Sequence, residues 1–180
     1  ADLRDKIYIA TKCSGAKNRT DVLSLLERSL ERMKTDYVDI LQLHNPGELP
    51  DPDDPESTYA GLVEAKKRGM IRHIGITNHS RDVARKAVES GLFDTLQFPL
   101  SAISAAEDFA LAELCEKRDV GFIAMKAFCG GLLDDAELAF AGLRNHQNVV
   151  PIWGVQRLSE LEEIVSLENS PPIFTPELTA

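Results

Sequence analysis

The stretch "DYVDILQLHNP", residues 36–46, joins a short apolar run to an abrupt polar end. Positions 37–43 are mostly aromatic, β-branched or aliphatic, which is typical of a buried strand. The run stops on His44, and the turn-forming residues Asn45 and Pro46 follow it. A core strand does not need an imidazole at its end, so this histidine indicates a functional site.

Similar runs recur along the chain, separated by segments with apolar residues at helical spacing. The predicted strands cover residues 6–11, 37–43, 71–77, 94–100, 121–127 and 149–155. The predicted helix caps are Asn18 or Thr20, Ser104 with Glu107 in a capping box, and Ser159, and a further helix is predicted from Ser80 to about Ser90. Strands that alternate with helices imply a parallel sheet with right-handed crossovers.

Two α/β architectures have this order of elements: a doubly wound open sheet and a (β/α)8 barrel that lacks two of its units. A doubly wound sheet that binds a dinucleotide needs a glycine-rich turn after its first strand. The segment "ATKCSGAKNRTD" (10–21) has a single glycine at that place, and the chain has no P-loop. We therefore expect a TIM barrel, with residues 1–180 forming a single domain.

The composition argues against several kinds of partner. The formal net charge of −9 argues against nucleic acid, because phosphate binding needs a cationic face. No apolar run approaches the ~18 residues of a membrane span, so we expect no membrane partner. Cys13, Cys115 and Cys129 form no CxxC pair, which predicts free thiols in a reducing cytoplasm. Ligand spacings such as CxxC or HxxxH are absent, so no metal is expected.

Polar residues follow or end every predicted strand. In parallel barrels the carboxyl ends of the strands meet at one rim, where chemistry takes place. A single polar strand end is usually a turn or a cap, whereas six at one rim predict a site. These residues are Lys12, His44, Thr77, Asn78, Gln97, Lys126, Gln156 and Arg157.

Five segments resemble, in order, the signatures of the aldo-keto reductases. They are "KIYIATK" (6–12), "TDYVDILQLHNP" (35–46), "AKKRGMIRHIGITNHS" (65–80), "FDTLQFPLS" (93–101) and "IAMKAFCGGLL" (123–133). The resemblance covers nearly the whole chain and places it as the third to eighth βα units of the barrel, about the last six. The Met-Lys-Ala form at 125–127 is similar to a microbial branch that often carries an iron–sulfur segment after the barrel.

The resemblance implies an NADP-dependent enzyme that passes a hydride from nicotinamide to a carbonyl. The family uses four catalytic residues, Asp, Tyr, Lys and His, and Lys12 and His44 occupy the Lys and His positions. The Asp and Tyr belong to the first barrel units, which we expect to precede Ala1 in a longer polypeptide. Lysine beside the tyrosine favours its phenolate, and the histidine can hydrogen-bond the developing oxyanion.

The resemblance also assigns cofactor contacts. Thr77, Asn78 and Gln97 would bind the nicotinamide carboxamide, and Met125 stands where many relatives stack a tyrosine on the ring. Gly130 and Gly131 fall where the chain wraps the pyrophosphate, and Lys126, at the end of the fifth strand, is a further cofactor-binding candidate. Gln156 and Arg157 lie where the chain holds the adenosine phosphate, with Arg157 the candidate for the 2′-phosphate. Simpler structural readings are turn caps for Thr77 and Asn78, and a core methionine for Met125. Glu160 and Ile164 replace the glutamine and asparagine that many relatives use for adenine, so NADP is expected but NAD stays open.

Two alternatives to a reductase of small carbonyl compounds remain at this stage. A Schiff-base aldolase also places a lysine at the end of a barrel strand, where desolvation activates it. A non-catalytic, reductase-like subunit would bind the cofactor without the upstream Asp and Tyr. The sequence leaves the identity of the carbonyl substrate and the oligomeric state open.

Overall fold

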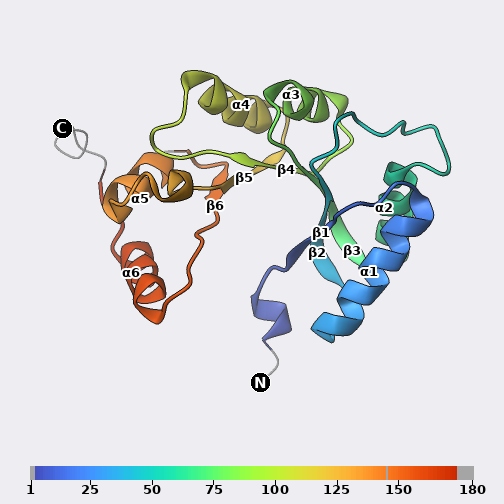
Figure 1. Ribbon diagram of the computed structural model, residues 1–180, viewed down its shortest axis with the longest axis horizontal. Helices are drawn as coiled ribbons and strands as arrows, with labels where there is room; N and C mark the ends of the chain where they lie inside the picture. The colour runs from blue at the N-terminus through green and yellow to red at the C-terminus, as the bar shows by residue number, and fades with distance from the viewer. Residues whose placement is uncertain (1–2, 145, 174–180) are drawn as a thin grey trace. The chain divides into compact units, whose positions relative to one another are not determined.

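The computed structural model describes residues 3–144 and 146–173, so both extremes of the predicted 1–180 domain lie outside the described residues. The chain divides into two compact units, residues 1–96 and 97–180. The elements are η1 (Arg4–Lys6), β1 (Ala10–Cys13), α1 (Arg19–Met33), β2 (Val38–His44), α2 (Thr58–Lys67), β3 (Ile71–Thr77), α3 (Arg81–Ser90), β4 (Thr95–Pro99), α4 (Ala106–Lys117), β5 (Gly121–Met125), η2 (Cys129–Gly131), α5 (Ala136–Arg144), β6 (Val149–Pro151) and α6 (Leu158–Asn169) (Figure 1).

The six strands form one sheet in the order β1-β2-β3-β4-β5-β6, which is their order along the chain. The pairs β1–β2, β2–β3 and β5–β6 are parallel. A doubly wound sheet reverses its strand order at a switch point, whereas a barrel keeps sequence order. The structure therefore confirms the α/β prediction and favours the partial barrel over the doubly wound sheet.

In the first unit, α1 and α2 lie side by side (Figure 1). Asn18 caps α1 by accepting a hydrogen bond from the backbone N–H of Asp21, as one of the two predicted caps. Gly61 permits the close approach of the helices, because a Cβ there would lie 2.8 Å from the Cβ of Val22. Ser80, the predicted start of the next helix, caps α3 by accepting a hydrogen bond from the backbone N–H of Val83.

The side chains of β2 alternate between two faces of the sheet. Leu41 and Leu43 lie on one face and are fully buried among apolar neighbours. Gln42 and His44 lie on the other face, and the parallel register places Gln42 between Lys12 of β1 and Gly75 of β3. The register places Lys12 and Thr77 on this second face as well.

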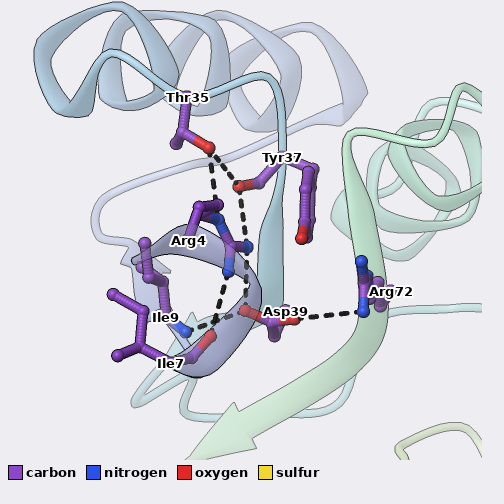
Figure 2. Close-up of polar contacts among 7 residues, drawn as sticks. All are labelled: Arg4, Ile7, Ile9, Thr35, Tyr37, Asp39 and Arg72. Atoms are coloured by element: carbon purple, nitrogen blue, oxygen red, sulfur yellow. Dashed lines mark hydrogen bonds and ion pairs between the residues drawn. The ribbon is translucent and has the colours of Figure 1, made fainter. Parts of the chain in front are cut away.

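A charged cluster holds the amino end of β2 (Figure 2). The carboxylate of Asp39, 2% exposed, lies 2.8 Å from Nη2 of Arg4 and accepts a hydrogen bond of 2.9 Å from the backbone N–H of Ile9. Arg72 of β3 lies 3.7 Å from its other oxygen. Burial alone would raise the pKa of Asp39, but the Ile9 N–H and the Arg4 and Arg72 guanidinium groups hold it below its ordinary value.

The second unit has its own apolar core beneath α4, α5 and β5. Its largest fully buried side chains include Leu111, Phe122 and Phe140. The ring of Trp153 stacks on Phe140, with ring centroids 5.2 Å apart. This ring contact packs the chain that follows β6 against α5.

Several predicted boundaries are wrong, for identifiable reasons. The first strand begins at Ala10 instead of residue 6, because the Ile9 N–H bonds to the side chain of Asp39 rather than to a backbone carbonyl of β2. The last strand ends at Pro151 instead of residue 155, where Trp153 turns toward Phe140.

Two predicted helix caps are also wrong. The Ser104 side chain accepts the backbone N–H of Ser101, so Ala105 starts α4 without a side-chain cap. Arg157 precedes α6 instead of Ser159, and the Glu160 carboxylate accepts the backbone N–H groups of Gln156 and Arg157, which lie just before the helix.

Candidate functional site

In the first unit, the predicted residues come from neighbouring strand ends. Lys12 is half-buried near the end of β1, and His44 is the exposed last residue of β2. Thr77 is the buried last residue of β3 and pairs in register with His44. The structure thus brings Lys12, His44 and Thr77 to one edge of three adjacent parallel strands.

The His44 ring has a partner that the sequence did not reveal. Ser14, in the loop after β1, places its Oγ 2.7 Å from Nδ1 of His44. A hydroxyl can donate to an unprotonated ring nitrogen, and in that arrangement the proton of the neutral ring is on Nε2. No motif points to Ser14, because the contact depends on the pairing of β1 with β2.

Asn78 is built into the turn that follows β3. It is 1% exposed, its Nδ2 donates to the carbonyl of Pro46 at 2.9 Å, and its Oδ1 accepts from the N–H of Ser80 at 2.8 Å. These bonds support the turn-capping interpretation of this residue. A primary amide has two donor hydrogens and two lone pairs, so its hydrogen-bonding capacity is not exhausted by them.

Gln42 and Thr95 are polar residues that the sequence analysis passed over. The Gln42 side chain is 0% exposed, and neither of its amide atoms has a hydrogen-bond partner. The buried hydroxyl of Thr95 has none either. Both flank Gly75, where an added Cβ would lie 2.9 Å from Cγ of Gln42. A glutamine inside an otherwise apolar strand was the available signal.

In the second unit, Gln97 in the middle of β4 contacts Met125 at the end of β5. Gln97 is buried, and its Nε2 lies 3.4 Å from Sδ of Met125. The backbone N–H of Leu100 bonds to the carbonyl of Met125 and ties the two strand ends together. Both predicted residues therefore belong to one polar contact, with the Met125 side chain only partly covered.

A cavity of about 690 Å³ lies in the second unit, lined mainly by the segments that follow β5 and β6. Its walls include four predicted cofactor residues, Lys126, Gly130, Gly131 and Gln156. Lys126, Gly130 and Gly131 all have positive φ, and a Cβ at either glycine would meet no atom within 4 Å. The glycines therefore leave open backbone that a ligand can approach closely.

Trp153 forms part of the same wall and was not predicted. Its ring packs between Phe128 and Phe140, with centroids 5.1 and 5.2 Å away. The indole Nε1 is buried and has no hydrogen-bond partner. The buried N–H is therefore an uncompensated polar group within the aromatic cluster behind the cavity wall.

The start of α6 forms the cavity's charged end. The Glu160 carboxylate accepts the backbone N–H groups of Gln156 at 2.7 Å and Arg157 at 3.1 Å. These bonds, and the charge of Arg157, hold the pKa of Glu160 below its ordinary value. The Arg157 side chain is 80% exposed, lies 3.4 Å from Glu160 through Nε, and is not among the residues that line the cavity.

All three tyrosines of the chain lie within the described residues, away from the predicted rim. Tyr8 is exposed before β1, and the ring of Tyr37 lies under the guanidinium groups of Arg4 and Arg72. The Tyr59 hydroxyl donates to the carbonyl of Leu92. None of them is placed to serve as a proton donor beside Lys12.

Within residues 3–144 and 146–173, no three His, Cys, Asp or Glu side chains cluster in a way that could hold a metal ion. In that same part of the chain, no helix is long and apolar enough to cross a membrane.

Comparison with known proteins gives a consistent result. The model of the "Aldo/keto reductase family" matches residues 1–173. The aldo-keto reductase YhdN of Bacillus subtilis is 28% identical over 158 residues, which cover 79% of this chain and 46% of YhdN.

Solved structures agree with this fold. The thermostable aldo-keto reductase Tm1743, solved with the inhibitor epalrestat, superposes with a TM-score of 0.77 at 25% identity, over 97% of this chain and 70% of its own. The Bombyx mori aldo-keto reductase AKR2E4 in complex with NADP gives a TM-score of 0.77 at 18% identity, over 98% of this chain and 67% of its own, and supports the fold alone. The chain spans about half the length of its curated relative YhdN.

Proposed function

This chain belongs to the aldo/keto reductase family, and from that premise we propose that the protein is an NAD(P)H-dependent oxidoreductase acting on an aldehyde or ketone. The observation that carries the proposal is the placement of Lys12 and His44 at the ends of adjacent parallel strands. These are the two catalytic positions that the family resemblance assigns to this part of the barrel.

The residues of the second unit suit a dinucleotide. The cavity offers open glycine backbone at Gly130 and Gly131, and Lys126 among its lining residues. When bound, the nicotinamide would supply the hydride that reduces the carbonyl carbon. Gly130, Gly131 and Lys126 would hold the pyrophosphate, and Gln156 and Arg157 the adenosine end.

The nicotinamide carboxamide would be held by Thr77, Asn78 and Gln97. Gln97 keeps an amide oxygen and a second N–H beyond its contact with Met125, and Asn78 retains unused capacity beyond its turn bonds. Met125 is partly exposed, and its thioether can pack on an aromatic ring.

Lys12 and His44 would stabilise charge during the transfer. The Ser14 hydroxyl holds Nδ1 of His44, so that an Nε2–H can donate to the carbonyl oxygen as negative charge develops there. The Lys12 ammonium would lower the pKa of a neighbouring phenol and favour proton transfer from it. The family resemblance assigns that phenol, with its Asp, to the first two barrel units.

Several finer features belong to the same proposal. We assign both compact units to one barrel domain and place the protein nearest the microbial branch that often carries a C-terminal iron–sulfur segment. We assign a small-molecule carbonyl substrate and a cytoplasmic location. Cys13, Cys115 and Cys129 are all free, and burial raises the pKa of Cys13 to about 11 and of Cys115 to about 12, which suits unreactive thiols in a reducing compartment.

A titration of the complete protein with NADPH, followed by nicotinamide fluorescence, tests the proposal. We expect saturable binding at micromolar cofactor, and the absence of binding at high micromolar cofactor would contradict the proposal. A Schiff-base aldolase would instead give a borohydride-stable adduct of the carbonyl substrate on Lys12. We expect no such adduct, with Lys67 on the exposed side of α2 as the control lysine.

A further inference from the structure

The charge of the cavity is unusual for a site that receives a phosphorylated cofactor. The ionisable groups that line it are three carboxylates, Asp134, Glu160 and Glu163, and one cation, Lys126. Lys126 lies close in sequence to Gly130 and Gly131, whereas Glu160 and Glu163 lie on α6, at the end of the cavity assigned to the adenosine. The adenosine end of the cavity is therefore acidic.

The N-terminus of α6 would ordinarily favour a phosphate. Free backbone N–H groups and the helix dipole both attract anions there. In this chain the Glu160 carboxylate lies at that N-terminus and accepts the N–H groups of Gln156 and Arg157, the two residues before the helix, at 2.7 and 3.1 Å. A second anion would have to displace Glu160 or lie beside its negative charge.

Arg157 does not offset this arrangement. It is the cation that the family resemblance offers to a 2′-phosphate, yet it is ion-paired with Glu160 and does not line the cavity. Its charge is thus partly neutralised before any ligand binds. A guanidinium that is shared with a carboxylate binds phosphate more weakly than one that is free.

A ribose without the 2′-phosphate fits the same groups well. A carboxylate accepts hydrogen bonds only, and a ribose hydroxyl can donate one. An acidic residue that bonds the ribose 2′-hydroxyl is the usual device of NAD-binding sites, whereas arginine accommodates a 2′-phosphate. Glu160 can serve as the acidic residue that accepts a hydrogen bond from the ribose 2′-hydroxyl.

We propose that Glu160 determines cofactor specificity in this protein by opposing the 2′-phosphate, so that NADH binds nearly as well as NADPH. The inference rests on the proposed function, because it assigns the cavity to the adenosine end of a nicotinamide dinucleotide.

The test compares dissociation constants of the complete protein for NADPH and NADH, measured by fluorescence titration. In Glu160→Gln the amide oxygen can still accept the two N–H groups, so the variant removes charge and keeps the cap. Glu162→Gln is the matched control, because Glu162 lies on the same helix, is exposed, and does not line the cavity.

We expect the native protein to bind the two cofactors within about tenfold of each other. Glu160→Gln should tighten NADPH roughly fivefold to tenfold, the scale of one charge repulsion near a surface, and leave NADH within about twofold. Glu162→Gln should change neither, and unchanged NADH binding shows that each variant is folded.

Two results would overturn the inference while leaving the proposed function intact: equal effects of Glu160→Gln on both cofactors, or equal effects of Glu160→Gln and Glu162→Gln on NADPH. If neither cofactor binds the native protein, the proposed function fails, and the inference fails with it.

Discussion

The two ends of strand β2 are built differently. At the amino end the buried Asp39 is satisfied by Arg4, Arg72 and the Ile9 N–H. Toward the carboxyl end the equally buried Gln42 has neither amide atom paired, and His44 ends the strand exposed with a single serine partner. A buried charge whose partners offset its desolvation can be kept in a stable fold, whereas an unpaired buried amide costs stability. The difference indicates that one end maintains structure and the other end serves a ligand.

The largest effect should come from Lys12 at the carboxyl end. We expect Lys12→Met in the complete protein to lower kcat by roughly 10²–10⁴-fold, the range for a lost acid–base contribution. Cofactor affinity and thermal stability should change little, because the half-buried methylene stem is retained. Lys67→Met on the surface of α2 is the control. Steady-state kinetics measure kcat and a melting curve measures thermal stability for the two variants. A Lys12→Met protein that loses stability but keeps kcat would show that Lys12 supports the fold and not the reaction.

Asp39 at the amino end should show the opposite profile. Asp39→Asn leaves Arg4 without its buried counter-charge, and we expect a loss of about 3–5 kcal/mol in the free energy of unfolding. Turnover per folded molecule should be unchanged. Chemical denaturation measures the loss, and Asp36→Asn, an exposed neighbour, should be near neutral. A kinetic defect in folded Asp39→Asn would remove the distinction between the two ends.

The lowered pKa of Asp39 also predicts a pH dependence. Because the folded pKa lies below the unfolded value, the group binds fewer protons in the folded state, and its stabilisation is present above the ordinary aspartate pKa. It is lost as the pH falls through the folded pKa. The stability difference between native protein and Asp39→Asn should therefore be largest at neutral pH and shrink in acid. A constant difference between pH 7 and acid would argue that Asp39 acts through its shape alone.

Replacing Gln42 with an apolar residue should stabilise the protein. Gln42→Met keeps the length of the side chain and removes two unpaired polar atoms, so we expect the free energy of unfolding to rise by roughly 1–3 kcal/mol. Denaturation of the complete protein without cofactor measures this. Gln147→Met in an exposed turn is the control and should gain nothing. A destabilised Gln42→Met would mean that Gln42 is paired in solution.

The smallest effect should come from Ser14. Ser14→Ala removes the hydroxyl that lies 2.7 Å from Nδ1 of His44, worth about 1 kcal/mol, so kcat should fall roughly fivefold. Ser14→Thr should restore most of it. Nitrogen chemical shifts of the His44 ring should show the Nε2–H tautomer in the native protein and a mixture in Ser14→Ala. Identical ring shifts in the two proteins would show that Ser14 does not orient the ring.

The strand ends were predictable to the residue in places. His44 and Thr77 end β2 and β3 as expected, because period-two apolar runs and the turn residues after them are local signals. Asn18 and Ser80 cap their helices for the same reason. Ser104 failed as a cap because the backbone of Ser101 competes for its hydroxyl. The Ile9–Asp39 bond that delays β1 joins residues 30 positions apart, beyond any local pattern.

The sequence by itself determined the α/β class, the order of strands and helices, and the polar strand ends that include Lys12 and His44. These follow from side-chain periodicity and turn chemistry, which act over a few residues. Only the tertiary structure decided three features: Ser14 contacts the His44 ring, Gln42 is buried without a hydrogen-bond partner, and Glu160 bonds the N–H groups just before α6 beside a cavity. Two of these depend on which strands pair, and the third on how a helix end meets a loop. Hydrogen-bond partners and burial are properties of the assembled chain, so the electrostatics of the site appear only there.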